Sequence, residues 1–215
     1  MIIKKILLDL RTYFSIHWKN KKRFPECVLE SAIPKNIKID SGTVIKKNCI
    51  ISNEIKSIGK HVYIGDGAKI FNCSHIDNYS CISHDVKIGL DNHKLDGLSI
   101  NPKFNQMEKS SPTIIGADVL ISANAVVMSG IKLGNGCVVG ANSFVNKDVP
   151  PYAIFAGSPA KLIRYRFDDK EIQKKLISKW WERDICEVKD LVLKKPKIEN
   201  LVFELKNRNH GKKPS

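Results

Sequence analysis

The stretch IIGADVLISANAVVMSGIKLGNGCVVGANSFVNKDV, residues 114–149, decides the fold. Aliphatic residues recur in it at strict intervals of six: Ile115, Ile121, Val127, Leu133, Val139 and Val145. The fourth residue after each of them is small or β-branched: Val119, Ala125, Ile131, Cys137, Ser143 and Val149. Gly and Asn stand between these positions, as in Gly134-Asn135-Gly136, and both residue types tolerate tight turns with positive φ.

The same six-residue phase occupies an earlier part of the chain. It comprises Ile58, Ile64, Ile70, Ile76, Ile82 and Ile88, preceded by a weaker run of Ile39, Ile45 and Ile51. A period of six fits neither an amphipathic helix nor one long strand. It fits a short strand followed by a corner, and three such units make a triangular coil. Stacked coils bury the aliphatic ladder along the axis, so the repeats predict an all-β solenoid.

The phase is lost between Ile88 and Ile115, which are 27 residues apart, not a multiple of six. The intervening segment 90–112 contains Asp-Asn-His, Asp-Gly, Asn-Pro and Ser-Pro, which are typical of loops. We therefore expect a loop that protrudes from the solenoid at this point. Long loops on compact scaffolds are often functional.

The segments on either side of the repeats differ from them in composition. We expect an N-terminal basic amphipathic segment over 1–35, the solenoid domain over 36–160, and a C-terminal helix with a polar tail over 161–215. Asp168 with Glu171 three residues later is a capping-box pattern that predicts the start of this helix.

The N-terminal segment carries apolar residues at near-helical spacing: Ile3, Ile6, Leu7, Leu10 and Phe14. Basic residues flank them: Lys4, Lys5, Arg11, Lys19, Lys21, Lys22 and Arg23. One interpretation is a helix that lies on a membrane surface. The other, which we favour at this point, is a helix that packs on the open end of the solenoid.

Composition restricts the function classes. The formal net charge is +14, which suggests a nucleic acid, a membrane surface, an anionic ligand or simply a lysine-rich surface. Aromatic residues are 7% and no nucleic-acid-binding motif is present, so we expect no nucleic-acid partner. The six cysteines form no CxxC pair and no zinc-ligand spacing with histidine, which predicts reduced thiols and no metal. We expect a cytoplasmic protein, at the inner membrane surface if the N-terminal segment binds lipid.

The stretch from Ile114 to Phe167, together with Trp180-Trp181, resembles the hexapeptide-repeat acyltransferases. It is most similar to the xenobiotic acetyltransferase branch, which acetylates chloramphenicol and streptogramins, and to related O-acetyltransferases of bacterial surface glycans. The resemblance implies a left-handed parallel β-helix and a homotrimer with active sites between subunits. It also implies acetyl-CoA as the co-substrate, with no metal.

The segment Asn92-His93-Lys94-Leu95-Asp96-Gly97 matches the family's catalytic segment, whose histidine acts as general base. Histidine suits this task because its unperturbed pKa lies near neutrality. The resemblance thus assigns the base to His93 and direct transfer to the mechanism, while Asp96 would either orient the imidazole or stabilise the loop. The alternative is His84, because a His84-Asp85 pair on a solenoid corner resembles the base of sugar N-acetyltransferases with this fold.

The resemblance places coenzyme A along the C-terminal coils. The pantetheine arm would pass the small residues Ala123, Asn124 and Ala141. Asn146-Lys147 matches the family's Thr/Ser-Lys pair near the nucleotide, and Lys147 and Arg164 would contact phosphates as charge-assisted donors.

Two departures from the antibiotic acetyltransferases bear on the acceptor. Those enzymes usually carry a Tyr-Pro-Phe motif and a longer acceptor loop, where this chain has Ile-Asn-Pro-Lys-Phe at 100–104. They usually have Trp and Gly where Leu120 and Ser122 stand. Both departures favour a hydroxyl of a carbohydrate or surface-glycan precursor as acceptor. An antibiotic acceptor, and a non-catalytic assembly scaffold, remain the alternatives.

Overall fold

The computed structural model describes residues 2–101, 103, 104 and 110–193; the side chains of residues 2–11, 13 and 191 are outside this description. The chain divides into two compact units, Met1–Arg164 and Tyr165–Ser215.

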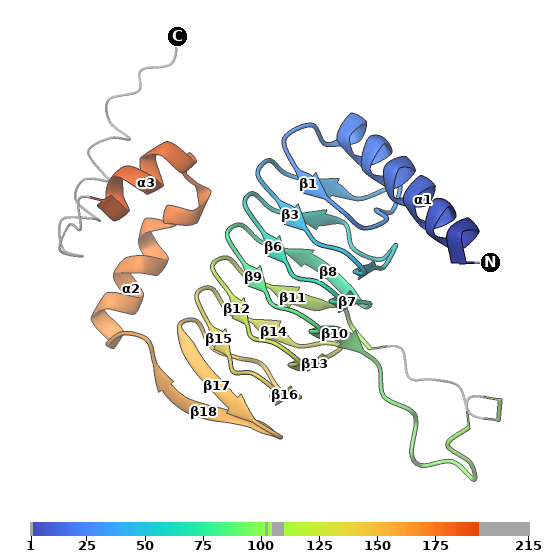
Figure 1. Cartoon of the computed structure of the whole chain (residues 1–215). Helices are drawn as coiled ribbons and strands as arrows, with labels where there is room; N and C mark the ends of the chain where they lie inside the picture. Colours follow the sequence, from blue (N-terminus) through green and yellow to red (C-terminus); the bar gives the residue numbers. More distant parts are fainter. Residues whose placement is uncertain (1, 102, 105–109, 194–215) are drawn as a thin grey trace. The chain divides into compact units, whose positions relative to one another are not determined.

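The first unit is a parallel β-solenoid with three sheets, and its coils lie one after another along the axis (Figure 1). Sheet A contains, in order, β1 (Val28–Leu29), β3 (Val44–Ile45), β6 (Tyr63–Ile64), β9 (Cys81–Ile82), β12 (Leu120–Ile121), β15 (Val138–Val139), β17 (Ala153–Gly157) and β18 (Ala160–Tyr165). Sheet B contains β2 (Lys38–Ile39), β5 (Ser57–Ile58), β8 (Cys73–Ile76), β11 (Thr113–Ile115) and β14 (Lys132–Leu133). Sheet C contains β4 (Ile50–Ile51), β7 (Lys69–Ile70), β10 (Lys87–Leu90), β13 (Val126–Met128) and β16 (Phe144–Val145). The predicted solenoid is thereby confirmed.

The aliphatic ladder is the core of this solenoid. All twelve aliphatic residues of the two long runs, from Ile58 to Val145, are at most 2% exposed. The two runs continue each other across the interruption, because Ile76 pairs with Ile115 and Ile82 pairs with Ile121 in neighbouring parallel strands. The ladder therefore keeps its register across the interruption, and the register shifts only at the two loop junctions, between Ile88 and Leu90 and between Thr113 and Ile114.

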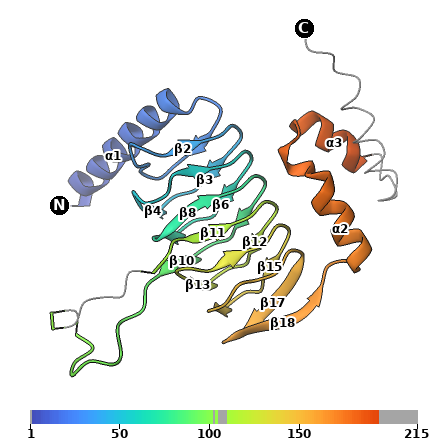
Figure 2. The same cartoon turned by 180° about the vertical axis from the view of Figure 1, so that it is seen from behind.

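The interrupting residues form the predicted loop. Strand β10 ends at Leu90 and β11 begins at Thr113, so the excursion covers 91–112, of which 102 and 105–109 lie outside the described residues. Figure 2, seen from behind, shows the loop projecting from the end of β10 well beyond the coils. The protruding loop is confirmed.

The N-terminal helix α1 (Ile2–Arg23) contacts the first coil through its C-terminal turns. The buried Asn20 side chain donates from Nδ2 to the carbonyl oxygens of Leu29 and Ser31, both at 2.9 Å. Arg23 donates to the carbonyl oxygens of 33–35 at 2.9–3.3 Å. The described turns of α1 thus pack on the end coil, while the side chains of Ile3, Ile6, Leu7 and Leu10 lie outside the description.

Among the described residues no helix has the length and apolarity needed to cross a membrane.

The second unit is helical where it is described. It contains α2 (Asp169–Ser178), the 3₁₀ turn η1 (Trp180–Glu182) and α3 (Ile185–Leu193). Asp168 is the N-cap of α2, and its carboxylate accepts a 2.8 Å hydrogen bond from the Glu171 N–H, which confirms the predicted helix start. Residues 194–215 of the predicted polar tail lie outside the described residues.

A pair of neighbouring residues on β4 tests the ladder. Ile51 is 8% exposed and belongs to the core, whereas Ile50 points outward and is 48% exposed. We expect Ile51→Ala to lower the free energy of unfolding by about 2–5 kcal/mol, because it leaves a cavity between stacked coils. The matched Ile50→Ala variant should lose about 1 kcal/mol or less. Urea denaturation measures both; equal losses would contradict the assigned orientation of β4.

Candidate active site

The loop is attached to the solenoid through the corners that lead from sheet C to sheet B, which we call the C–B corners. The Asn72 side chain, on the corner one coil earlier, holds both ends of the loop. Its Nδ2 lies 3.0 Å from the Ser110 carbonyl oxygen, 3.5 Å from Asp91 Oδ1 and 3.5 Å from the Ser111 carbonyl oxygen. The Ser129 hydroxyl of the following coil lies 3.4 Å from the same nitrogen. Sequence analysis missed Asn72, because it lies outside every motif.

Gly89 makes this close attachment possible. Its φ of +74° is strained for residues with a side chain, and an added Cβ would lie 2.4 Å from the Asn72 carbonyl oxygen. Asn72 N–H donates to the Gly89 carbonyl, and the Asn72 carbonyl accepts from Thr113 N–H at 2.9 Å. The loop therefore leaves and re-enters the solenoid at a fixed point.

His93 lies in the first part of the loop with its side chain exposed. Its Nδ1 is 2.9 Å from the Ile100 carbonyl oxygen. A carbonyl oxygen only accepts hydrogen bonds, so Nδ1 carries the hydrogen and, in the neutral ring, Nε2 carries the lone pair. This tautomer leaves Nε2 as the proton acceptor of the neutral imidazole.

Asp96, the other residue predicted in this segment, lies in an exposed part of the loop. Its Oδ1 lies 3.8 Å from Lys94 Nζ, within the same exposed turn. The described part of the loop also exposes four large apolar side chains, Leu95, Leu98, Ile100 and Phe104, among polar ones such as Asn92, Asn101 and Lys103. Leu98 and Phe104, with Gly97 and Ser99, line a hollow of about 380 Å³.

The alternative base, His84, lies on a different set, or column, of stacked corners, those that lead from sheet A to sheet C. We call these the A–C corners. His84 Nδ1 is 3.5 Å from Asp66 Oδ2, on the corner one coil earlier, so its carboxylate partner is Asp66. Both side chains are about half exposed. Both candidate bases thus have an acceptor beside Nδ1, a backbone carbonyl for His93 and a carboxylate for His84.

The small residues predicted to line the pantetheine arm lie on the same column as His84. Asn124 N–H donates to the His84 carbonyl at 3.1 Å, and Asn142 N–H donates to the Ala123 carbonyl at 3.0 Å. Ala123 is half-buried, and Asn124 and Ala141 are exposed. These corners thus stack directly on the corner that carries His84.

Asn146 and Lys147 lie on the other column, with the loop. They directly follow β16, a strand of sheet C. In that sheet β16 pairs with β13 and β13 pairs with β10, the strand from which the loop departs. Lys147 Nζ lies 5.8 Å from the centre of the Phe155 ring, a cation–π distance. Arg164 is exposed near the end of β18.

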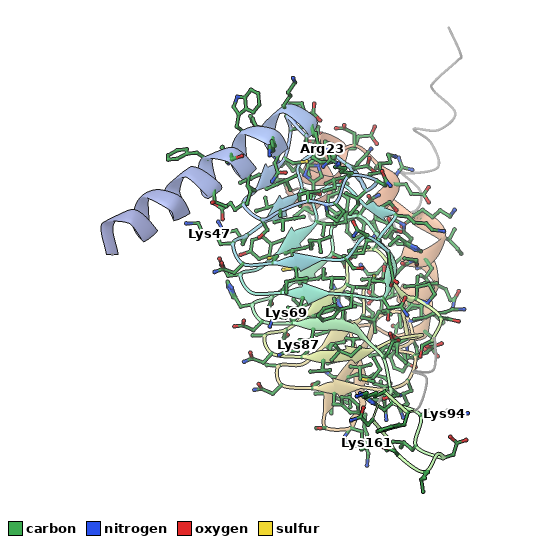
Figure 3. All side chains as sticks on the ribbon, turned by 90° about the vertical axis from the view of Figure 1, so that its right-hand side faces the viewer. Arg23, Lys47, Lys69, Lys87, Lys94 and Lys161 are labelled. Atoms are coloured by element: carbon green, nitrogen blue, oxygen red, sulfur yellow. The ribbon has the colours of Figure 1, made fainter. Side chains whose placement is uncertain are left out.

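Sheet C separates the two columns and carries positive charge. Lys69 and Lys87 face outward on adjacent strands β7 and β10, directly paired in register, and Figure 3 shows them one below the other on the same side of the solenoid. Like charges on adjacent strands repel, and a bound anion relieves that repulsion. This side of the molecule therefore suits an anionic ligand.

Four of the cysteines are poor candidates for a covalent nucleophile. Burial raises the pKa of the Cys73 thiol to about 12, and burial likewise raises the pKa of Cys27, Cys49 and Cys81. A thiol reacts as its thiolate, so these groups are inert near neutrality. Acyl transfer at this site would have to proceed without an acyl-cysteine at these positions.

Comparison with known proteins identifies the repeats. The family profile described as "Bacterial transferase hexapeptide (six repeats)" matches residues 112–147. A chloramphenicol acetyltransferase of Klebsiella aerogenes is 40% identical in an alignment of 116 residues that covers 48% of this chain and 55% of the relative. A probable macrolide acetyltransferase of Lysinibacillus sphaericus is 30% identical in an alignment of 152 residues that covers 62% of this chain and 84% of that protein. The chain belongs to the hexapeptide-repeat transferase family.

Hexapeptide-repeat transferases of known structure share this solenoid. A hexapeptide-repeat acetyltransferase from Vibrio cholerae, solved with acetyl coenzyme A, matches with a TM-score of 0.50 and 25% identity over 69% of this chain and 75% of that one. The polySia specific acetyltransferase NeuO matches with a TM-score of 0.50 and 26% identity over 67% of this chain and 69% of that one. This chain spans about half the length of the chloramphenicol acetyltransferases that it matches.

The attachment of the loop can be tested with two asparagines of the C–B corners. We expect Asn72→Ala to release both loop ends, because it removes the side-chain contacts to Asp91, Ser110 and Ser111. Amide hydrogen exchange at Thr113 and Ser129 should then increase by about tenfold or more, because their N–H groups bond to the main-chain carbonyls of Asn72 and Leu90 at the loop junctions. Asn53, exposed on the preceding corner of this column, is the matched control. Unchanged exchange in Asn72→Ala, or an equal increase in Asn53→Ala, would contradict the anchoring role.

Proposed function

We propose that this protein transfers the acetyl group of acetyl-CoA to a hydroxyl of a carbohydrate or surface-glycan precursor, with His93 as general base. The observation that carries the proposal is the 2.9 Å contact between His93 Nδ1 and the Ile100 carbonyl oxygen, on a loop anchored to the solenoid. This contact leaves Nε2 as the acceptor for a proton. The Asn-His segment of the loop and the acetyltransferase relatives support the same chemistry.

The step that His93 performs is the movement of one proton. Nε2 accepts the proton of the acceptor hydroxyl while its oxygen forms a bond to the thioester carbonyl carbon. The carbon–sulfur bond then breaks, and the imidazolium returns the proton to the departing thiolate. The Ile100 carbonyl keeps the ring in one orientation and favours the protonated form that exists between these events. No acyl-enzyme is needed, in keeping with the raised pKa values of the buried thiols.

The described residues fit a bound acetyl-CoA in two respects. Corners with short side chains, Ala123 and Ala141, let a narrow arm approach the backbone. Exposed cations, Lys147 and Arg164, and the Lys69–Lys87 pair on sheet C provide charge for its phosphates. The complex of the Vibrio cholerae acetyltransferase with acetyl coenzyme A supports this assignment. In the same proposal the protein is a homotrimer, since the flat faces of a solenoid can bury one another around a closed threefold axis.

A second candidate is an antibiotic hydroxyl as acceptor. The four exposed apolar side chains of the loop, and the hollow beside Leu98 and Phe104, favour an apolar acceptor. Relatives named chloramphenicol and macrolide acetyltransferase point the same way, whereas the polySia specific acetyltransferase supports a glycan. Mass spectrometry after incubation with acetyl-CoA distinguishes the acceptors: the proposal expects the mass of an acetyl group on glycan precursors, and acetylation of chloramphenicol alone would replace it.

The two histidines can be separated by matched substitutions. We expect His93→Ala to lower kcat/KM about 10²–10⁴-fold, the usual effect of removing a general base. His84→Ala should stay within about threefold of the wild type, because proton transfer does not pass through it. Initial rates of coenzyme A release measure both variants, with thermal unfolding to confirm folding. Turnover of His93→Ala within about tenfold of wild type would refute its role, and a large loss in His84→Ala alone would favour the sugar N-acetyltransferase alternative.

A further inference from the structure

The helix α1 binds the solenoid through its more polar side. Asn20, buried at 5% exposure, makes two hydrogen bonds to the first coil. Ile16 and Thr12, four and eight residues earlier, line the hollow of about 500 Å³ between the helix and the coils. Residues spaced by four share one side of a helix, so Thr12, Ile16 and Asn20 define the side that faces the solenoid.

The opposite side of α1 carries aromatic residues. Phe14 and Trp18 are four residues apart, and each is about 200° around the helix from residues of the solenoid-facing side. They are 64% and 67% exposed. A helix that merely capped the coil would be expected to turn its largest apolar side chains inward. In this helix Asn20 faces the solenoid, and the aromatic side chains of Phe14 and Trp18 face solvent.

Basic residues border the aromatic pair. The last turn of α1 contains Lys21, Lys22 and Arg23, and its first turn contains no acidic residue. Lys22 Nζ lies 5.8 Å from the centre of the Trp18 ring, and Lys19 is exposed beside it. Figure 3 shows Arg23 where the helix meets the coils, so the basic last turn of α1 is also the turn that attaches the helix to the solenoid. Within 2–23 the sequence has seven Lys and Arg residues and one acidic residue, Asp9.

We propose that this outer side of α1 binds the surface of an anionic lipid bilayer, with Phe14 and Trp18 inserted at the interface and the flanking lysines on the headgroups. An exposed aromatic pair together with a basic border is the combination that interfacial helices use. Phe and Trp at the boundary of a membrane bury apolar area that the solenoid leaves exposed. The apolar spacing noted in the sequence up to Phe14 continues to Trp18 in steps of three or four. The surface lies on an element separate from His93, so the proposal goes beyond acetyl transfer.

Cosedimentation of the full chain with vesicles tests the proposal. We expect binding to vesicles that contain phosphatidylglycerol, little binding to pure phosphatidylcholine, and loss of binding as NaCl rises. The double variant F14S/W18S should bind at least about tenfold more weakly, and K19Q/K22Q several-fold more weakly. Matched controls are I177S/V192S, which replaces two exposed apolar side chains of the second unit, and K56Q/K132Q, which removes two exposed lysines of the solenoid. Both controls should bind like the wild type.

Four results would overturn the proposal. The first three are equal binding of the wild type to both kinds of vesicle, wild-type binding by F14S/W18S, and an equal loss in the control variants. A fourth is a change in the oligomer mass of F14S/W18S by light scattering, since the face would then join copies of the chain. The vesicle measurement requires no acetyl transfer, so its failure and the failure of the proposed activity are distinguishable.

Discussion

Each coil of this solenoid can bury its aliphatic side chains only against the coils before and after it, and the remainder of the structure depends on this constraint. A two-residue strand such as β9 offers one fully buried side chain, too little for a core of its own. Ile82 is fully buried because Ile64 and Ile121 flank it in paired strands. The six-residue spacing reflects this requirement, because a shift of one residue within a strand would turn its aliphatic side chain outward.

The same constraint explains how a long loop is tolerated. An insertion at a corner costs no ladder contact as long as the chain returns in register, and Ile115 does return opposite Ile76. The junction then has to be secured locally, which Asn72 and Gly89 do with side-chain and backbone hydrogen bonds. Regular coils therefore supply a rigid platform, while the chemically distinctive residues, His93 among them, are placed where the regularity stops.

The two ends of the described chain use helices differently. On α2, Ile172 is buried within the second unit, and the N-cap Asp168 begins the helix as its sequence pattern predicts. On α1 the inward contact is polar, through Asn20, and the exposed residues are aromatic. An amphipathic pattern alone does not say which side faces the protein, because a membrane surface and a protein core both take up apolar side chains.

The sequence by itself determined the solenoid, its buried ladder, the protruding loop and the N-cap of α2, because these follow from spacing and from local hydrogen bonding. It also singled out His93, Lys147 and the small corner residues through their resemblance to a family. Only the tertiary structure decided which residues stand beside one another on successive coils. The carboxylate next to His84 is Asp66 rather than the adjacent Asp85, the group on His93 Nδ1 is the Ile100 carbonyl, and both ends of the loop meet at Asn72. Such neighbours lie one coil or one loop apart in the chain, and their contact depends on the path of the backbone between them, which residue spacing does not specify.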